Sequence, residues 1–147
     1  MSGLQPAAGL EAFTPIIGRW ASQGETVATQ DEPSVDILGT DVYTWIADGH
    51  FIEHRVHVRM GDDLVEALEV IGGTEGSAVH MRSFDNEGTY SEMRGTVNVD
   101  GAMTFAGDGV RTTLTAAEDG QSMQARWERS ENGHDWTHWM DMRFTRI

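Results

Sequence analysis

Short segments in which apolar and polar residues alternate recur along the whole chain, and glycine-rich turns separate them. Alternation with a period of two is typical of a β-strand that has one face in a core and the other in solvent. The dipeptides Asp48-Gly49, Asp100-Gly101, Asp119-Gly120 and Asn132-Gly133 favour the positive φ angles of tight hairpin turns. The pattern predicts strands over residues 18–29, 37–47, 50–60, 64–71, 78–84, 89–98, 102–106, 110–117, 121–131 and 134–146.

The connections between these strands are too short for parallel crossovers, so neighbouring strands must pair antiparallel as a meander. An open meander of this length would leave two long edges unpaired, and closure into a barrel removes both. Pro6 suits a first helical turn, which predicts a short helix over residues 6–13 that ends or bends at Pro15. The sequence therefore predicts a single all-β domain over residues 1–147, a closed up-and-down barrel of about ten strands with an N-terminal helix plugging one end.

The last hairpin indicates which side chains point into the barrel. A two-residue turn at Asn132-Gly133 would pair Trp127 with His138 and gather mostly apolar side chains on one face. That face carries Met123, Ala125, Trp127, His138, Met140, Met142 and Phe144. The opposite face carries polar and charged side chains together with Trp139, a composition typical of a solvated outer surface.

The turn at Asp48-Gly49 fixes a second register, which pairs Tyr43 with His54 and Trp45 with Ile52. The apolar row that contains His54 then faces inward, whereas a three-residue loop would turn the charged row inward instead. A barrel of this size either holds one small ligand or is filled by packed side chains. The predicted ligand contacts are Tyr43, Trp45, His54, Met123, Trp127, His138, Met140 and Phe144.

Composition excludes several kinds of chemistry. The chain has no cysteine, and all ten of its basic residues are arginine, so thiolate metal sites, thiol nucleophiles and lysine Schiff bases are absent. A formal net charge of -14 disfavours nucleic acids and anionic membranes as partners.

On a strand His57 points away from His50 and His54, so we expect no metal site there. The chain has no signal peptide pattern and no run of about 18 apolar residues, so we expect a cytoplasmic location. We also expect a monomer or a homodimer.

Several residues could supply a general acid or base if the protein were a cofactor-free isomerase or cyclase. The candidates are His138, His54, Glu66, Glu92 and Tyr90. Glu66 shares a strand face with apolar residues, where burial would raise the pKa of its carboxyl; at an open barrel mouth it would be solvated instead. Tyr90 and Glu92 suit an outer cross-strand ladder of polar groups equally well.

The first and last predicted strands carry a recognisable pattern, in which residues 17–20 read Ile-Gly-Arg-Trp and Arg146 lies near the end of the chain. This pattern resembles the calycin barrels, which include lipocalins and fatty-acid-binding-type proteins. In those families a G-x-W motif opens the first strand, and an arginine from the last strand packs across the tryptophan. The resemblance implies that Gly18, Trp20 and Arg146 form the closed end, with the guanidinium stacked on the indole.

Longer stretches, such as residues 43–51 and 126–128, resemble a bacterial family of small lipocalin-like barrels, most of which have no assigned function. The nitrobindins, a neighbouring calycin family, bind ferric haem through a cavity-facing histidine on the last strand, and His138 lies at a comparable place. That resemblance implies haem b on His138 as an alternative, although only Gly24 stands where the nitrobindins have a run of glycines. The principal prediction is that the barrel interior binds a small hydrophobic or amphipathic molecule without a cofactor.

Overall fold

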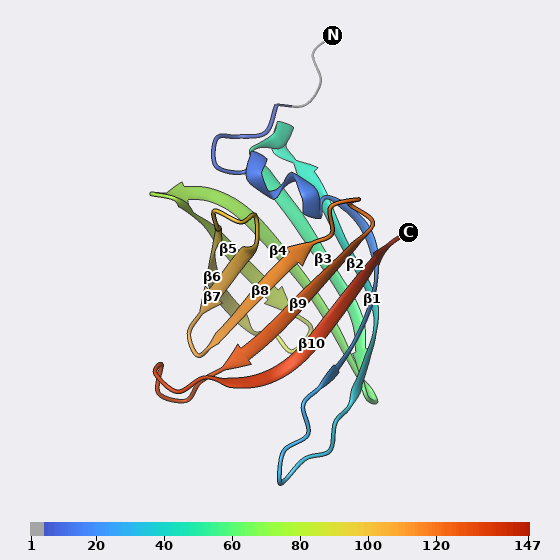
Figure 1. The fold of residues 1–147 in the computed structure, drawn as a ribbon. Helices are drawn as coiled ribbons and strands as arrows, with labels where there is room; N and C mark the ends of the chain where they lie inside the picture. The colour runs from blue at the N-terminus through green and yellow to red at the C-terminus, as the bar shows by residue number, and fades with distance from the viewer. Residues whose placement is uncertain (1–4) are drawn as a thin grey trace.

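Ten antiparallel strands close into a barrel in the computed structural model, which describes residues 5–147 (Figure 1). The strands are β1 (Gly18–Thr26), β2 (Asp36–Ile46), β3 (Phe51–Met60), β4 (Asp63–Glu75), β5 (Ala78–Asp85), β6 (Tyr90–Val97), β7 (Met103–Gly107), β8 (Val110–Ala116), β9 (Ser122–Arg129) and β10 (Thr137–Arg146). Each strand pairs with its neighbours in the chain, and β1 pairs with β10 to complete the ring. The predicted fold class is therefore confirmed.

The N-terminal helix is shorter and lies later in the chain than predicted. It is a 3-10 helix, η1 (Glu11–Ile16), instead of a helix over residues 6–13. Gly9, at φ 87°, interrupts the helical backbone there. Phe13 and Ile16 are buried and join the core, so the helix covers one end of the barrel as expected (Figure 1).

The covered end is held by the contact between Trp20 and Arg146 that the calycin resemblance implies. Trp20 is fully buried, and the Arg146 guanidinium carbon lies 4.2 Å from the centroid of its ring. Arg146 also donates hydrogen bonds to the carbonyls of Ile17, at 2.8 Å, and Gly120, at 2.9 Å. Gly18 has a φ of 135°, and a β-carbon there would collide with the Arg146 guanidinium, which explains the glycine.

The hairpin of β2 and β3 has the predicted register. Tyr43 pairs with His54 and Trp45 with Ile52, around a tight turn in which Asp48 and Gly49 both have positive φ angles. A turn of this kind matches the natural twist of the paired strands, so the alternation read from the sequence holds along both of them. The apolar row of β3 therefore faces the interior.

The predicted register of the last hairpin is wrong by two residues, because Trp127 pairs with Met140 and not with His138. Residues 130–136 form a longer loop, organised by the Asn132 side chain, whose Oδ1 accepts hydrogen bonds from the backbone N–H groups of His134 and Asp135 at 2.8 Å each. An Asn side chain that bonds the following backbone builds such a turn locally. The shift is even, so Met140 still faces the interior.

A β-bulge between His138 and Met140 reverses the alternation at the start of β10. His138 pairs with Glu128 and turns outward, where its Nε2 lies 2.9 Å from Oδ1 of the half-exposed Asp141. Trp139, which the sequence places on the outer face, instead lines the interior beside Met140. Because of the bulge, Trp139 faces the interior where the sequence predicts His138.

Candidate functional site

The barrel encloses a cavity of about 360 Å³, lined by residues from every strand except β1. Most of the wall is apolar, with contributions from Ile37, Val56, Val58, Met60, Val65, Ala67, Met81, Met93, Phe105, Val110, Leu114, Ala125, Trp127, Trp139, Met140, Met142 and Phe144. The polar lining residues are Asp41, Tyr43, His54, Glu69, Ser83, Ser91 and Thr112. A cavity of this volume, with few polar groups on an apolar wall, is typical of a small-molecule site.

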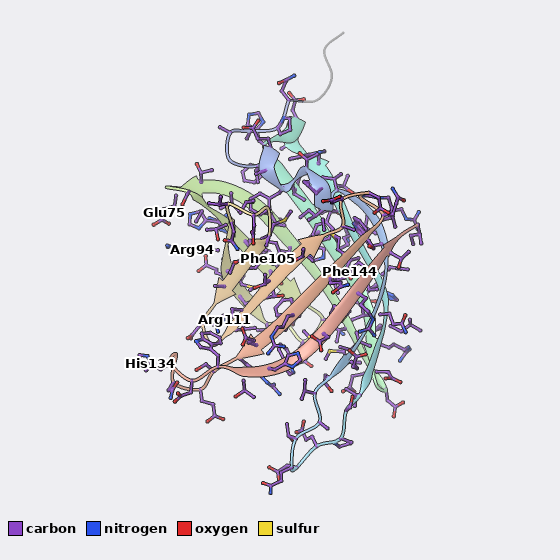
Figure 2. The ribbon with its side chains drawn as sticks, viewed as in Figure 1. Glu75, Arg94, Phe105, Arg111, His134 and Phe144 are labelled. Carbon is purple, nitrogen blue, oxygen red and sulfur yellow. The ribbon has the colours of Figure 1, made fainter. Side chains whose placement is uncertain are left out.

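The cavity opens at the barrel end remote from η1. Phe105, deep in the barrel, packs on Phe13 of that helix at 6.3 Å between ring centroids. At the other end the lining becomes accessible, since Ser91 at the start of β6 is exposed and Trp127 near the end of β9 is half-buried. Figure 2 shows Arg111 on this side of the barrel, away from η1. A ligand would therefore enter past β6 and β9.

A buried polar cluster lies on the wall formed by β2, β3 and β4. His54 Nε2 lies 2.7 Å from Asp41 Oδ2, and His54 Nδ1 lies 2.9 Å from Glu69 Oε1. Asp41 Oδ1 also accepts a hydrogen bond from the Ser22 hydroxyl at 2.5 Å. A neutral imidazole has only one N–H, so His54 can donate to both carboxylates only as an imidazolium.

The ionisation of the cluster follows from its partners. Burial by itself would lower the pKa of His54, but the hydrogen bonds and charges of Asp41 and Glu69 outweigh it and raise that pKa to about 9. The Tyr43 ring stacks on the imidazole, with 3.9 Å between centroids. Burial, and then the charges of the same two carboxylates, raise the pKa of the Tyr43 hydroxyl well above its usual value. Tyr43 is therefore a neutral hydroxyl beside a charged cluster.

Strand register brings this cluster together. His54 lies directly across from Tyr43 on β2 and from Glu69 on β4. Asp41 is two residues from Tyr43 and so shares its face. The three ionisable groups thus come from three adjacent strands, and a slip of one residue in either pairing would turn one of them to solvent.

The wall opposite the cluster holds one unpaired polar atom. Thr112, on β8, is 2 % exposed and lines the cavity. Its Oγ1 is the one fully enclosed polar side-chain atom in residues 5–147 that has no hydrogen-bond partner. Because β8 is five positions from β3 in either direction around the ring, this hydroxyl lies across the barrel from His54.

Aromatic and arginine side chains surround the open end. The Trp127 and Trp139 rings meet edge to face with 6.2 Å between centroids. The two-residue turn predicted at Asn132-Gly133 would also pair Arg129 with Trp136 at the rim, but the partners differ. Arg129 stacks over Trp139 at 4.6 Å and Arg111 over Trp136 at 4.1 Å. The shifted register of the last hairpin causes this exchange.

The predicted ligand contacts divide into three groups. Those that line the cavity are Tyr43, His54, Trp127, Met140 and Phe144. Met123 instead belongs to the packed core, and the partly buried Trp45 packs against that core; neither lines the cavity. His138 is outside, bonded to Asp141, so a haem held in the cavity by His138 does not fit this structure.

The acid and base candidates other than His54 are also outside the cavity. Glu66 faces outward, 3.3 Å from His57 Nε2, and is half-exposed. Tyr90 is exposed, and Glu92 shares its outward face on β6. These side chains match the solvated alternatives that the sequence left open.

Sequence reasoning missed Asp41 and Glu69 as site residues. Asp41 was detectable, since the Asp48-Gly49 turn already puts it on the same face as Tyr43. Over residues 64–71, each of the two alternating rows contains one glutamate among apolar residues, so the pattern alone does not choose between Glu66 and Glu69. The turn at Gly61-Asp62 decides it, because a two-residue turn there pairs Glu69 with His54.

Residues 5–147 form the described part of the chain. It contains no group of three or more His, Cys, Asp or Glu side chains suited to a metal ion. It also contains no helix long and apolar enough to cross a membrane.

No protein-family model matches this chain, and no curated protein sequence matches it. Solved structures do resemble it in fold. Rv2717c from M. tuberculosis has a TM-score of 0.71 at 15% identity, over 97% of this chain and 99% of that one. The S-type phycobiliprotein lyase CPES from Guillardia theta has a TM-score of 0.64 at 10% identity, over 93% and 91%. A fluorescence-activating β-barrel designed de novo has a TM-score of 0.51 at 16% identity, over 92% and 97%. At these identities the comparisons establish the fold alone, a β-barrel that this chain shares over almost its whole length.

Proposed function

We propose that the chain binds a small hydrophobic or amphipathic molecule inside the barrel. The observation that carries this proposal is the cavity of about 360 Å³, with its apolar wall, its polar cluster and its accessible end. Natural ligand sites combine a mostly apolar wall with a few placed polar groups in this way. Two of the structures similar in fold are a phycobiliprotein lyase and a fluorescence-activating designed barrel. The proposed binding of a small molecule inside the barrel is compatible with both of them.

Each part of the lining has a proposed role. Trp127, Met140 and Phe144 supply apolar contact area, since large flat or flexible side chains bury much surface on binding. Tyr43 and His54 orient the polar end of the ligand at the deep wall. Trp139 joins the contact set, in the place that the sequence assigns to His138.

The contacts of His54 favour a role in binding over a role in catalysis. A general base needs a free lone pair, and both ring nitrogens of His54 already donate to carboxylates. The pKa of about 9 keeps the imidazolium charged at neutral pH. The cluster is therefore suited to fix charge and geometry in the cavity.

Uptake of a neutral fluorescent probe, N-phenyl-naphthylamine, tests the proposal. We expect saturable binding of one probe per chain with a blue shift, because the cavity is apolar. Ala67→Phe adds a ring on the cavity wall and should weaken probe binding about tenfold or more through steric exclusion. Ala106→Phe adds the same ring on the exposed outer face of β7 and is the matched control.

Absence of uptake by the unmodified protein, or equal uptake by all three proteins, would refute binding inside the barrel. Native mass spectrometry of protein purified without added ligand supplies an independent measurement. A retained small molecule that is lost from the Ala67→Phe variant would also define the mass of the natural ligand.

A further inference from the structure

The polar cluster leaves one carboxylate oxygen free on the cavity side. Both oxygens of Asp41 are engaged, by Ser22 and by His54. Glu69 uses Oε1 for His54, and no group in residues 5–147 donates to its Oε2. Thr112 Oγ1 is the one fully enclosed polar side-chain atom in residues 5–147 that has no hydrogen-bond partner. Glu69 Oε2 also has no partner, so Oε2 is not fully enclosed. Glu69 lines the cavity, so Oε2 is accessible to a ligand.

The cavity wall also carries an excess of negative charge. The cluster combines two carboxylates with one imidazolium, which leaves a net charge of about -1. No arginine lines the cavity to balance it. Arg111 and Arg129 are stacked on tryptophans at the open end. In an apolar enclosure such a charge is weakly screened and attracts a cationic group strongly.

The rest of the cavity wall is mostly apolar and fits a hydrocarbon or aromatic body. Thr112 lies across the barrel from the cluster, but its hydroxyl is enclosed and is not offered to a ligand in the cavity.

We infer that the ligand is a small amphipathic amine, whose protonated nitrogen donates to Glu69 Oε2 and whose apolar body fills the cavity. This inference rests on the proposed binding function and names the class of molecule that the same site takes. The imidazolium of His54 opposes a second cation, but the two carboxylates outnumber it, and Glu69 presents its free oxygen to the cavity.

Competition with bound N-phenyl-naphthylamine compares three probes that share one chain and differ in the head group: octylamine, octanol and octanoate. At neutral pH octylamine is the ammonium. We expect it to displace the dye at a concentration about tenfold or more below that of octanol, because a charge-assisted hydrogen bond is stronger than a neutral one. Octanoate should be the weakest of the three, since the cluster repels it.

Glu69→Gln keeps the shape of the side chain and removes its charge. This variant should bind octylamine about tenfold more weakly and octanol within about threefold of the unmodified protein. Glu66→Gln is the matched control, since it makes the same charge change on the same strand but on the outer face. Its ranking of the three probes should equal that of the unmodified protein.

The outcomes separate the two proposals. Dye uptake with equal displacement by the three probes, or with a preference for octanol or octanoate, overturns the amine inference and leaves the binding function standing. A preference for octylamine that Glu66→Gln abolishes as fully as Glu69→Gln also overturns it, because overall charge would then be the cause. Absence of dye uptake removes the binding function itself. Even if Glu69→Gln does not fold, equal displacement or a preference for octanol or octanoate in the unmodified protein still overturns the inference.

Discussion

The charged state of His54 predicts how the stability of the protein depends on pH. Its pKa is raised from 6.5 to about 9 in the folded protein, so the native state holds a proton that the unfolded chain releases above pH 6.5. The resulting stabilisation is fully present below pH 6.5 and is lost as the pH rises through 9. At about 1.4 kcal/mol per pKa unit, the whole effect is about 3 kcal/mol.

The free energy of unfolding, measured by urea titration at intervals from pH 6.5 to 9.5, tests this prediction. Its slope should be negative and approach about -1.4 kcal/mol per pH unit in the middle of the range. His57→Gln, which changes an outward histidine on the same strand, should keep this slope. His54→Gln should lose most of the slope between pH 7.5 and 9, whatever its overall stability.

A flat profile over that range would refute the assignment of His54 as an imidazolium. So would a slope that survives in His54→Gln, since another group would then be responsible. The histidine side-chain signals in NMR spectra give a direct check. The His54 ring should titrate near pH 9 in the folded protein, well above an exposed histidine.

Two further predictions concern stability. Arg146→Met removes the stack on Trp20 and the hydrogen bonds to carbonyls at the closed end, and should lower the free energy of unfolding by about 3 kcal/mol in urea titrations. Arg143→Met loses only an exposed ion pair with Glu25 and should lower the free energy of unfolding much less than Arg146→Met; equal losses would contradict a special role for Arg146. Thr112→Val keeps the shape and deletes the unpaired hydroxyl, so thermal unfolding of the ligand-free protein should show a gain of about 1 kcal/mol. A loss instead would mean that water already satisfies the hydroxyl.

The barrel and one of its walls could be predicted from the sequence because their signals are local. Alternation along the strands and short glycine turns imply an antiparallel meander, and closure follows from the edges that a meander leaves. Where a turn spans two residues, as at Asp48-Gly49, counting outward from it places each side chain correctly. Tyr43 and His54 were found in that way.

The wall formed by β9 and β10 could not be derived so directly, because the turns at Asp48-Gly49 and Asn132-Gly133 have similar sequences but different lengths. Asn132-Gly133 reads as a tight hairpin, yet the Asn132 side chain bonds backbone groups of its own loop and enlarges it. Trp127, Met140 and Phe144 were still placed inside, since the error was an even number of residues. A charged cluster across three strands is still harder to predict, because the registers of both strand pairings must be correct at the same time.

The bulge on β10 has a consequence for how the lining of this barrel can diversify. Side-chain direction there depends on one extra residue in the strand, and a regular ladder through the same sequence would turn His138 inward and Trp139 outward. A change of length in the adjoining loop can therefore exchange an indole for an imidazole at the entrance while every amino acid of β10 stays the same. Related barrels that bind different compounds need differ there only by an insertion or a deletion.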